Sequence, residues 1–278
     1  MRNLLSVLGS AVGSDAASPG QVILTTHSPT TLVELEAKQL WVTRKDPNGD
    51  VTLTQMSKDL QGLLRSHPDA FLAKAVIVGE GATEYGFIRG LDAAWCSSPG
   101  GRPLAHSGIA LADGGGSRCA NVAQELAATG YRVALLCDSD RELTPSPDLL
   151  RAAGVKVLQW PGDVATEQRL AQDLPIPVLG GVLELFLQEH GVGQVRGDIA
   201  SELGHDKEDL PSDLTQWREV VGEEELRSAV GKLAKSRGWM KRIDHGQAVG
   251  ALVGNAGQEL DGTPLWSVLR DLRAWVHE

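Results

Sequence analysis

Apolar and polar positions in the middle of the chain predict strands that alternate with helices. Short apolar runs typical of buried strands are separated by segments with helical spacing. We expect a strand and then a helix in 74–95, a strand in 107–117, a helix in 119–130, a strand in 131–140, and a helix and then a strand in 149–162. The run 133–137 contains no polar residue, which is typical of a strand buried on both faces. This order predicts an α/β fold with a mainly parallel sheet flanked by helices.

The pattern changes on both sides of this alternation. Residues 1–19 predict a helix and a loop, and 21–35 predict a strand, a turn and a helix that starts near Thr30. Two β-rich runs flank Asp46-Pro47-Asn48-Gly49 and predict a hairpin over 38–56. Strand signals fade from about 167 to 235, where we expect helices only, and a closing pair of helices is predicted in 245–257 and 264–278.

The composition allows a sizeable core and disfavours several classes of protein. The chain has 278 residues, of which 42% are hydrophobic, enough for one large domain or two small ones. Cys96, Cys119 and Cys137 show no paired spacing, which points to a reducing compartment and away from a disulfide scaffold or a zinc site. No apolar stretch is long enough to span a bilayer and no secretory signal opens the sequence, so we expect a cytoplasmic protein without a membrane partner. With a formal net charge of -10, nucleic-acid binding would depend on a local basic patch or on metal ions.

Four carboxylates are predicted to meet where strands end. Glu80 follows the first apolar run, and Asp138 and Asp140 follow a later one. Because residues two apart in extended backbone point to one side, we expect these two aspartates to face one point at the carboxyl edge of the sheet, with Ser139 turned away. Glu84, one helical turn after Glu80, is expected to lean back towards it. Converging carboxylates repel unless cations neutralise them, and oxygen ligands suit Mg²⁺ or Mn²⁺.

Each motif alone has an ordinary explanation. An isolated E-x-x-x-E is usually a solvated helix face, and an isolated D-x-D is usually a turn or a cap. Both motifs after buried strands of one βα array are more specific, and two ions about 4 Å apart at such a site assist phosphoryl transfer. The glycine-rich loop 113–117 has two open interpretations: backbone amides that approach a substrate phosphate, or a tight turn.

Two stretches resemble a Toprim domain. They are VIVGEGATEYGFIRGL at 76–91 and VALLCDSDRE at 133–142. The Toprim pattern is a glutamate after the first strand and a D-x-D after a later strand, and Glu80, Asp138 and Asp140 match it. Toprim is the catalytic fold of topoisomerases, bacterial primases and certain nucleases.

A third stretch, VILTTHSPTTL at 22–32, resembles the switch-histidine region of ABC-type ATPases. His27 is at the position of the switch histidine. The chain has no G-x-x-x-x-G-K-[ST] phosphate loop, so we expect a remnant of that ATPase and an inert His27. An ATPase followed by a Toprim domain is the layout of the OLD (overcoming lysogenization defect) nucleases, and the chain resembles their class 2 type. The resemblance implies four parts: an ATPase remnant with a connecting hairpin at 1–70, a Toprim core at 71–176, a helical insertion at 177–238, and the C-terminal completion of the Toprim region at 239–278.

The resemblance also implies a function, namely a metal-dependent DNA endonuclease that uses two divalent ions, Mg²⁺ or Mn²⁺. The implied metal ligands are Glu80, Glu84, Asp138, Asp140 and a further acid after the D-x-D strand, for which Glu167 is favoured over Asp163. The family's catalytic lysine matches Lys241, although Met240 stands where an aromatic residue is common. A basic cluster predicted to contact the DNA backbone consists of Lys232, Lys235, Arg237 and Arg242. The implied partners are DNA and the N-terminal ATPase domain of the full-length protein.

Three functions other than a nuclease are alternatives for a Toprim domain. A topoisomerase needs a nucleophilic tyrosine, and Tyr85 and Tyr131 both lie inside the Toprim elements, where they are poorly placed. A primase would normally carry a zinc-binding module, which the cysteines do not provide. The remaining alternative is an inactive Toprim module that binds DNA or a partner protein.

A lone histidine such as His245 is more often structural than catalytic.

Overall fold

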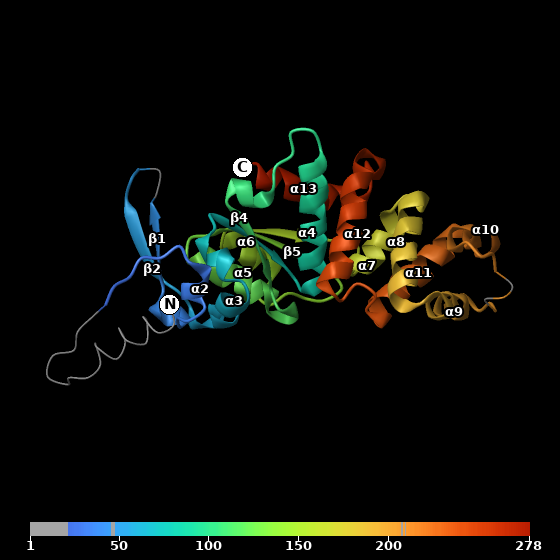
Figure 1. Ribbon diagram of the computed structural model, residues 1–278, viewed down its shortest axis with the longest axis horizontal. Helices are drawn as coiled ribbons and strands as arrows, with labels where there is room; N and C mark the ends of the chain where they lie inside the picture. Colours follow the sequence, from blue (N-terminus) through green and yellow to red (C-terminus); the bar gives the residue numbers. More distant parts are fainter. Residues whose placement is uncertain (1–21, 46–47, 207, 209) are drawn as a thin grey trace.

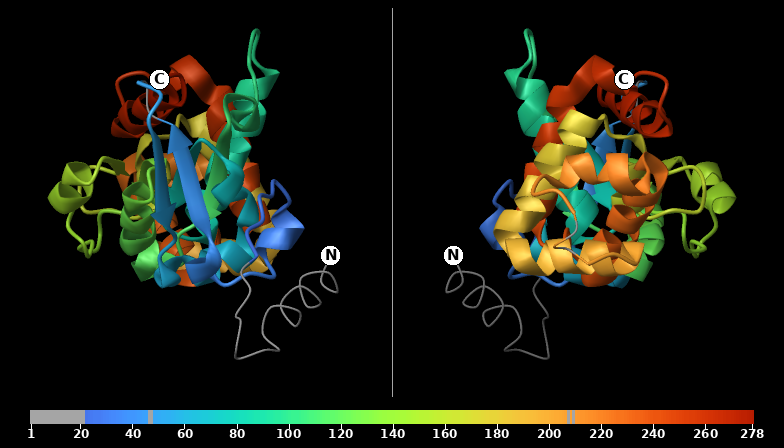
Figure 2. Two further views of the ribbon diagram at one scale, coloured as in Figure 1. Left: turned by 90° about the vertical axis from the view of Figure 1, so that its left-hand side faces the viewer. Right: turned by 90° about the vertical axis from the view of Figure 1, so that its right-hand side faces the viewer.

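A computed structural model describes residues 22–45, 48–206, 208 and 210–278 (Figure 1). The helix and loop predicted for 1–19, and two residues of the predicted hairpin turn, lie outside these residues. The described chain extends from a β-hairpin at one end, through a parallel sheet, to a group of helices at the other end (Figures 1 and 2). No described helix combines the length and the apolar character that are needed to cross a membrane.

The central sheet has four parallel strands in the order β4-β3-β5-β6. The strands are β3 (Ala75–Gly79), β4 (Ile109–Asp113), β5 (Arg132–Cys137) and β6 (Val155–Gln159). All four fall within the predicted segments, and the parallel arrangement flanked by helices confirms the predicted fold class. Gly79, the last residue of β3, lies opposite Asp113 of β4 and Leu136 of β5, so these strands end at one edge of the sheet.

Helices make up most of the remaining structure, and the second sheet is a two-stranded hairpin. The hairpin strands are β1 (Trp41–Lys45) and β2 (Val51–Gln55). The helices that matter below are α2 (Pro29–Leu32), α3 (Gln61–Ser66), α4 (Ala82–Ser97), α5 (Cys119–Ala128), α6 (Pro147–Ala152), α7 (Thr166–Asp173), α8 (Ile176–His190), α9 (Val192–Leu203), α10 (Arg218–Val221), α11 (Glu223–Arg237), α12 (Ile243–Ala256) and α13 (Pro264–Val276).

Both faces of the sheet are buried, each in its own hydrophobic core. Alternate residues of a strand point to opposite faces. Val76 and Val78 of β3 therefore pack against α3, α5 and the residues before β3. Ala75 and Ile77 point the other way, into a larger core formed with α4, α8, α9 and α11 to α13. The predicted helical segment thus shares one continuous core with the sheet.

Helices α4 and α12 pack with their backbones in close contact. A Cβ atom added to Gly90 would lie 2.1 Å from the carbonyl oxygen of Gln247, and one added to Gly250 would lie 2.1 Å from the carbonyl oxygen of Phe87. No side chain fits at either position, so these glycines allow the close approach. The hydroxyl of Thr83 in α4 also donates to the carbonyl of Met240, 3.1 Å away. This seam fixes the start of α12 beside the start of α4.

Helix α11 packs against α7 in a similar way. A Cβ atom added to Gly231 would lie 3.0 Å from Cα of Gln168, which shows how closely the two helices approach. Arg227, one turn earlier, donates hydrogen bonds of 2.8 Å to the carbonyls of Ala171 and Leu174 at the end of α7. The helical extension is therefore attached to the segment that follows β6.

The strand predicted in 21–35 is wrong for the described residues. Residues 22–28 form no strand, and the following helix α2 covers only four residues. A strand needs a neighbour for its backbone hydrogen bonds, and neither described sheet offers one here. The side chain of Ile23 remains 83% exposed.

Candidate metal centre at the carboxyl edge of the sheet

Five acidic residues lie close together in the segments that follow strands β3, β5 and β6. Glu80 comes directly after β3, and Asp138 and Asp140 come directly after β5. Glu84 lies in the first turn of α4, and Glu167 lies in the first turn of α7. The parallel order of the strands brings these segments, which are far apart in the sequence, to one edge.

Hydrogen bonds connect the segments that follow β3, β5 and β6. Oε2 of Glu80 accepts from the backbone N–H of Asp138 at 3.0 Å. The hydroxyl of Thr166 lies 2.8 Å from Oε1 of Glu84 and 2.8 Å from Oδ1 of Asp138. The other oxygen of Glu84 accepts from the N–H of Gly81 at 3.0 Å. Glu84 therefore contacts Thr166 through one oxygen and the backbone directly after Glu80 through the other.

Burial and mutual repulsion raise the pKa values of Glu80, Glu84, Asp138 and Glu167. The pKa of Glu84 is raised well above its usual value, first by burial and then by the charge of Asp138. Burial also raises the pKa of Asp138, against the hydrogen bonds from Thr166 that lower it. The pKa of Glu80 is raised by burial and then by Asp138, and burial raises that of Glu167 to about 7. Burial and the neighbouring carboxyls thus outweigh the effect of the nearby lysines on these pKa values.

Two lysines approach the acids from the C-terminal part of the chain. Nζ of Lys235 in α11 lies 2.6 Å from Oδ2 of Asp140 and 3.3 Å from Oε1 of Gln168. Lys241 is exposed, forms no ion pair among the described residues, and lies near enough to Glu167 to lower its pKa. Lys235, predicted as part of a DNA-binding cluster, is thus in direct contact with the acidic edge.

The other three members of the predicted basic cluster are paired with acids on the surface. Lys232 pairs with Glu202, Nη2 of Arg237 lies 3.2 Å from Asp198, and Nη2 of Arg242 lies 2.5 Å from Asp244. The cluster does not form an uncompensated positive surface. Its role in DNA binding stays a prediction.

The glycine-rich loop 113–117 uses its amides within the protein. The N–H groups of Gly114 and Gly116 donate to the carbonyls of Gly79 and Glu80, both at 2.8 Å. Gly115 donates to the carboxylate of Asp113 at 2.8 Å and has a φ of +75°. This arrangement favours the tight turn over a phosphate cradle, and it fixes the backbone that carries Glu80.

Other residues singled out from the sequence lie away from this chemistry. Asp163 sits on an exposed turn with a φ of 55°, while Glu167 is buried among the acids. The hydroxyl of Tyr131 is fixed by a 2.8 Å hydrogen bond to the carbonyl of Phe71, and burial raises its pKa to about 12. Ser139 is turned away from the aspartates, as predicted, with its hydroxyl accepting from the N–H of Val164 at 2.9 Å. His27 is exposed.

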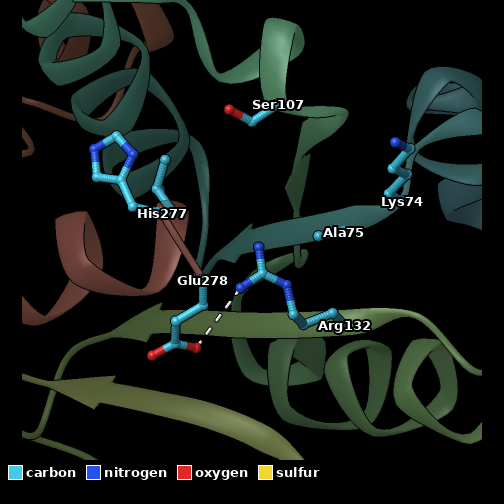
Figure 3. A pocket seen from close by; sticks show the side chains of 7 residues that line it. Lys74, Ala75, Ser107, Arg132, His277 and Glu278 are labelled. Carbon is cyan, nitrogen blue, oxygen red and sulfur yellow. Dashed lines mark ion pairs between the residues drawn. The ribbon is translucent and has the colours of Figure 1, made fainter. Parts of the chain in front are cut away.

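A pocket of about 390 Å³ lies at the opposite end of the sheet, where β3 and β5 begin. Figure 3 shows its lining, with Lys74, Ser107 and His277 around the ion pair between Arg132 and Glu278, whose atoms are 3.7 Å apart. None of the acids at the carboxyl edge lines this pocket. It therefore belongs to another part of the molecule.

The donor set at the carboxyl edge fits divalent ions in its chemistry. All the candidate ligands are carboxylates, the hard oxygen donors that Mg²⁺ and Mn²⁺ prefer. Among the described residues, Oε1 of Glu80 and Oδ2 of Asp138 receive no hydrogen bond. Within the same part of the chain, however, no three His, Cys, Asp or Glu side chains already adopt an arrangement that would hold an ion. Ion binding would require these side chains to draw together.

Thr166 and Trp160, which lie at this edge, were not predicted from the sequence. Thr166 contacts two of the acids, and its hydroxyl accepts a 2.7 Å hydrogen bond from the indole N–H of Trp160. A threonine directly before Glu167 at a helix start is a weak signal, since it reads as an ordinary helix-terminal residue. Its contact with Glu84 depends on a fold that brings together residues 82 positions apart.

The parallel sheet, its flanking helices and the acids at the strand ends are the features of a Toprim domain, a class associated with nuclease-type or metal-binding roles. Residues 71–140 match the family model described as "Overcoming lysogenization defect protein-like, TOPRIM domain". This part of the chain is similar to the Toprim domain of OLD-like proteins. No curated protein matches the chain.

A solved structure shares a distant likeness with the chain. It is described as the "C-terminal region of the Xanthomonas campestris pv. campestris OLD protein phased with platinum". The sequence identity is 15% and the TM-score is 0.33, with 74% of this chain and 99% of that chain covered. A score this low does not support residue-by-residue comparison.

Proposed function

We propose that the protein is a metal-dependent DNA endonuclease, acting through two divalent ions at the carboxyl edge of the sheet. The observation that carries the proposal is the meeting of Glu80, Glu84, Asp138, Asp140 and Glu167 at one edge of an OLD-like Toprim domain, with raised pKa values in four of them. Buried like charges of this kind are costly unless cations neutralise them.

The chain's own residues would divide the work as follows. Glu80, Glu84, Asp138, Asp140 and Glu167 would hold Mg²⁺ or Mn²⁺. Bound ions at such a site activate water and neutralise phosphate charge. The ammonium groups of Lys235 and Lys241, which reach the acids from α11 and from the turn before α12, would stabilise the charge that grows on the phosphate.

DNA would have to be held by local groups, because the chain carries a net charge of -10. Lys241 is exposed and Lys235 is partly exposed at the acidic edge, so both can meet a phosphate. We also propose that an ATPase domain of the full-length protein is a second partner, because residues 22–32 resemble the switch-histidine region of ABC-type ATPases. We further propose that the protein acts in the cytoplasm.

The test is incubation of supercoiled plasmid with the purified chain in Mg²⁺, Mn²⁺ or EDTA, without ATP. The expected result is nicking or linearisation with either ion and none in EDTA. Asp138→Ala should abolish it, and Asp163→Ala, on the exposed turn after β6, is the matched control that should keep it.

A binding-only Toprim module is the second candidate, and one observation favours it. The described acids hold no ready-made coordination geometry. Glu80, Glu84 and Asp138 accept hydrogen bonds from the protein itself, and Asp140 pairs with Lys235. If folded protein binds neither Mn²⁺ nor Mg²⁺ in calorimetry and cuts nothing, this candidate replaces the nuclease.

A further inference from the structure

Thr166 occupies the junction between the segments that carry the acids. It is fully buried, at the first position of α7. Its hydroxyl lies between Oε1 of Glu84 and Oδ1 of Asp138, and its backbone N–H donates to the same Asp138 oxygen at 2.8 Å. One side chain therefore contacts the carboxylates that follow β3 and β5.

The hydroxyl has a defined orientation because of Trp160. A threonine hydroxyl has one proton to donate and can accept from other groups. The indole N–H of Trp160, which only donates, takes one acceptor site at 2.7 Å. The proton of the hydroxyl is then directed to the side of the two carboxylates. Trp160 is itself only 1% exposed and packs edge-on against Phe87 of α4, with ring centroids 6.3 Å apart, so its own position is fixed.

These contacts determine which carboxylate oxygens remain available. The N–H of Thr166 donates to Oδ1 of Asp138, which also lies 2.8 Å from the hydroxyl, so Oδ2 is the Asp138 oxygen that receives no hydrogen bond among the described residues. Glu84 is held through Oε1 by Thr166 and through Oε2 by Gly81. Without the hydroxyl, two buried carboxylates would face each other with no donor between their oxygens.

We propose that Thr166, oriented by Trp160, is a positioning residue that sets the relative placement of Glu84 and Asp138 for binding a divalent ion. The inference rests on the proposed function, since it concerns the same site. Hydrogen-bonding partners behind metal ligands commonly change ion affinity by about 10-fold to 100-fold when removed.

The test is calorimetric titration of the full 278-residue chain with Mn²⁺. Thr166→Val keeps the shape but removes the hydroxyl, and is expected to weaken binding by about 10-fold or more. Thr166→Ser restores the hydroxyl and should bind within about threefold of the wild type. Thr129→Val removes a buried hydroxyl that bonds the carbonyl of Leu126, away from the acids, and should leave the affinity unchanged.

A second readout follows the Trp160 indole directly. In ¹⁵N–¹H spectra its N–H signal is assigned by its absence in Trp160→Phe. Addition of Mg²⁺ should shift this signal in the wild type and not in Thr166→Val, because the hydroxyl links the indole to the carboxylates. The indole N–H of Trp217, which donates to the carbonyl of Pro211, is the internal control and should not respond.

The outcomes separate the two proposals. Wild-type protein that binds no ion overturns the proposed function and this inference together. Wild-type protein that binds while Thr166→Val binds equally well overturns this inference alone. If Thr166→Val does not fold, Trp160→Phe carries the test: a weakening of about tenfold supports the positioning role, and an affinity within about threefold of the wild type overturns it.

Discussion

The acidic edge of the sheet and the basic stretch of α11 and α12 hold charge in opposite ways. At the edge, carboxylates are buried side by side, and their pKa values rise first because of burial and then because of the neighbouring carboxylates. Along the basic stretch, Lys232, Arg237 and Arg242 are exposed and each pairs with a neighbouring acid. Lys235 is the point where the two regions meet.

The difference shows that the number of charges in a segment does not locate the functional site. Exposed ion pairs are worth little because water already screens them. Buried charges of one sign store interaction energy that an added ion can release. The chemistry is therefore expected at the acidic edge, and the basic stretch is expected to matter through Lys235 and Lys241.

Neutralising Asp138 should have the largest effect. Asp138→Asn keeps the size of the side chain, and cleavage is expected to fall by more than about 1,000-fold, because a central ligand and its charge are lost. Metal-free protein should at the same time become more resistant to heat, because repulsion with Glu80 and Glu84 is relieved. A variant that loses both activity and thermal stability would show a structural role instead. Plasmid cleavage and thermal unfolding in EDTA measure the two effects.

Removing the ammonium of Lys235 should separate chemistry from ion binding. Lys235→Met is expected to lower cleavage roughly 100-fold, because a charge beside the reacting phosphate is lost. Mn²⁺ should bind tighter than in the wild type, because the ammonium no longer competes for Asp140. Lys232→Met, on the same helix but paired with Glu202, is the matched control for both assays. Weaker Mn²⁺ binding in Lys235→Met would contradict this account.

The pH dependence of stability should reveal the unbalanced edge without any ion. The pKa of Glu167 is about 7 in the folded protein against a usual 4.5, so the folded state binds the proton more tightly. Its contribution to stability is present below about pH 4.5 and is lost as the pH rises to 7. In EDTA, the free energy of unfolding should fall by roughly 1–3 kcal/mol more in wild type than in Glu167→Gln between pH 5 and 7.5. Equal slopes in urea titrations of the two proteins would count against a raised pKa.

The paired surface cations should give the smallest effect. The double change Lys232→Gln and Arg237→Gln removes the exposed cations of two ion pairs, with Glu202 and Asp198. Stability should change by less than about 0.5 kcal/mol, and DNA binding in 0.15 M salt by no more than a few-fold. A loss of DNA affinity of more than about tenfold, measured by fluorescence anisotropy, would show that the basic stretch contacts DNA.

The fold was predicted well from the sequence where hydrophobic patterns are strong. All four parallel strands, the hairpin and the helical character of 177–238 follow from periodicity and turn residues. The strand expected in 21–35 failed because Val22, Ile23 and Leu24 have strand propensity but no neighbouring strand in the described structure. Propensity alone does not supply the hydrogen bonds that a strand requires.

Glu80, Asp138 and Asp140 were predicted from their places after apolar runs. Glu84 was predicted from its helical spacing and Glu167 from the family resemblance, but the contacts of these acids were not predicted. Thr166 touches Glu84 and Asp138 only because α7 follows β6 into the same edge. Lys235 reaches Asp140 because α11 approaches α7 closely at Gly231. Both contacts depend on helix packing over long sequence separations, which no local pattern encodes.

The glycine seam between α4 and α12 has a mechanical consequence. Because the two backbones touch at Gly90 and Gly250, α12 cannot slide along α4 without a clash, and Lys241, just before α12, keeps its place relative to Glu84. Lys235 belongs to α11, and its distance to Asp140 depends on the packing of α11 on α7, where Arg227 bonds the end of α7. The two lysines therefore reach the acids through different helix contacts, one between α4 and α12 and the other between α7 and α11.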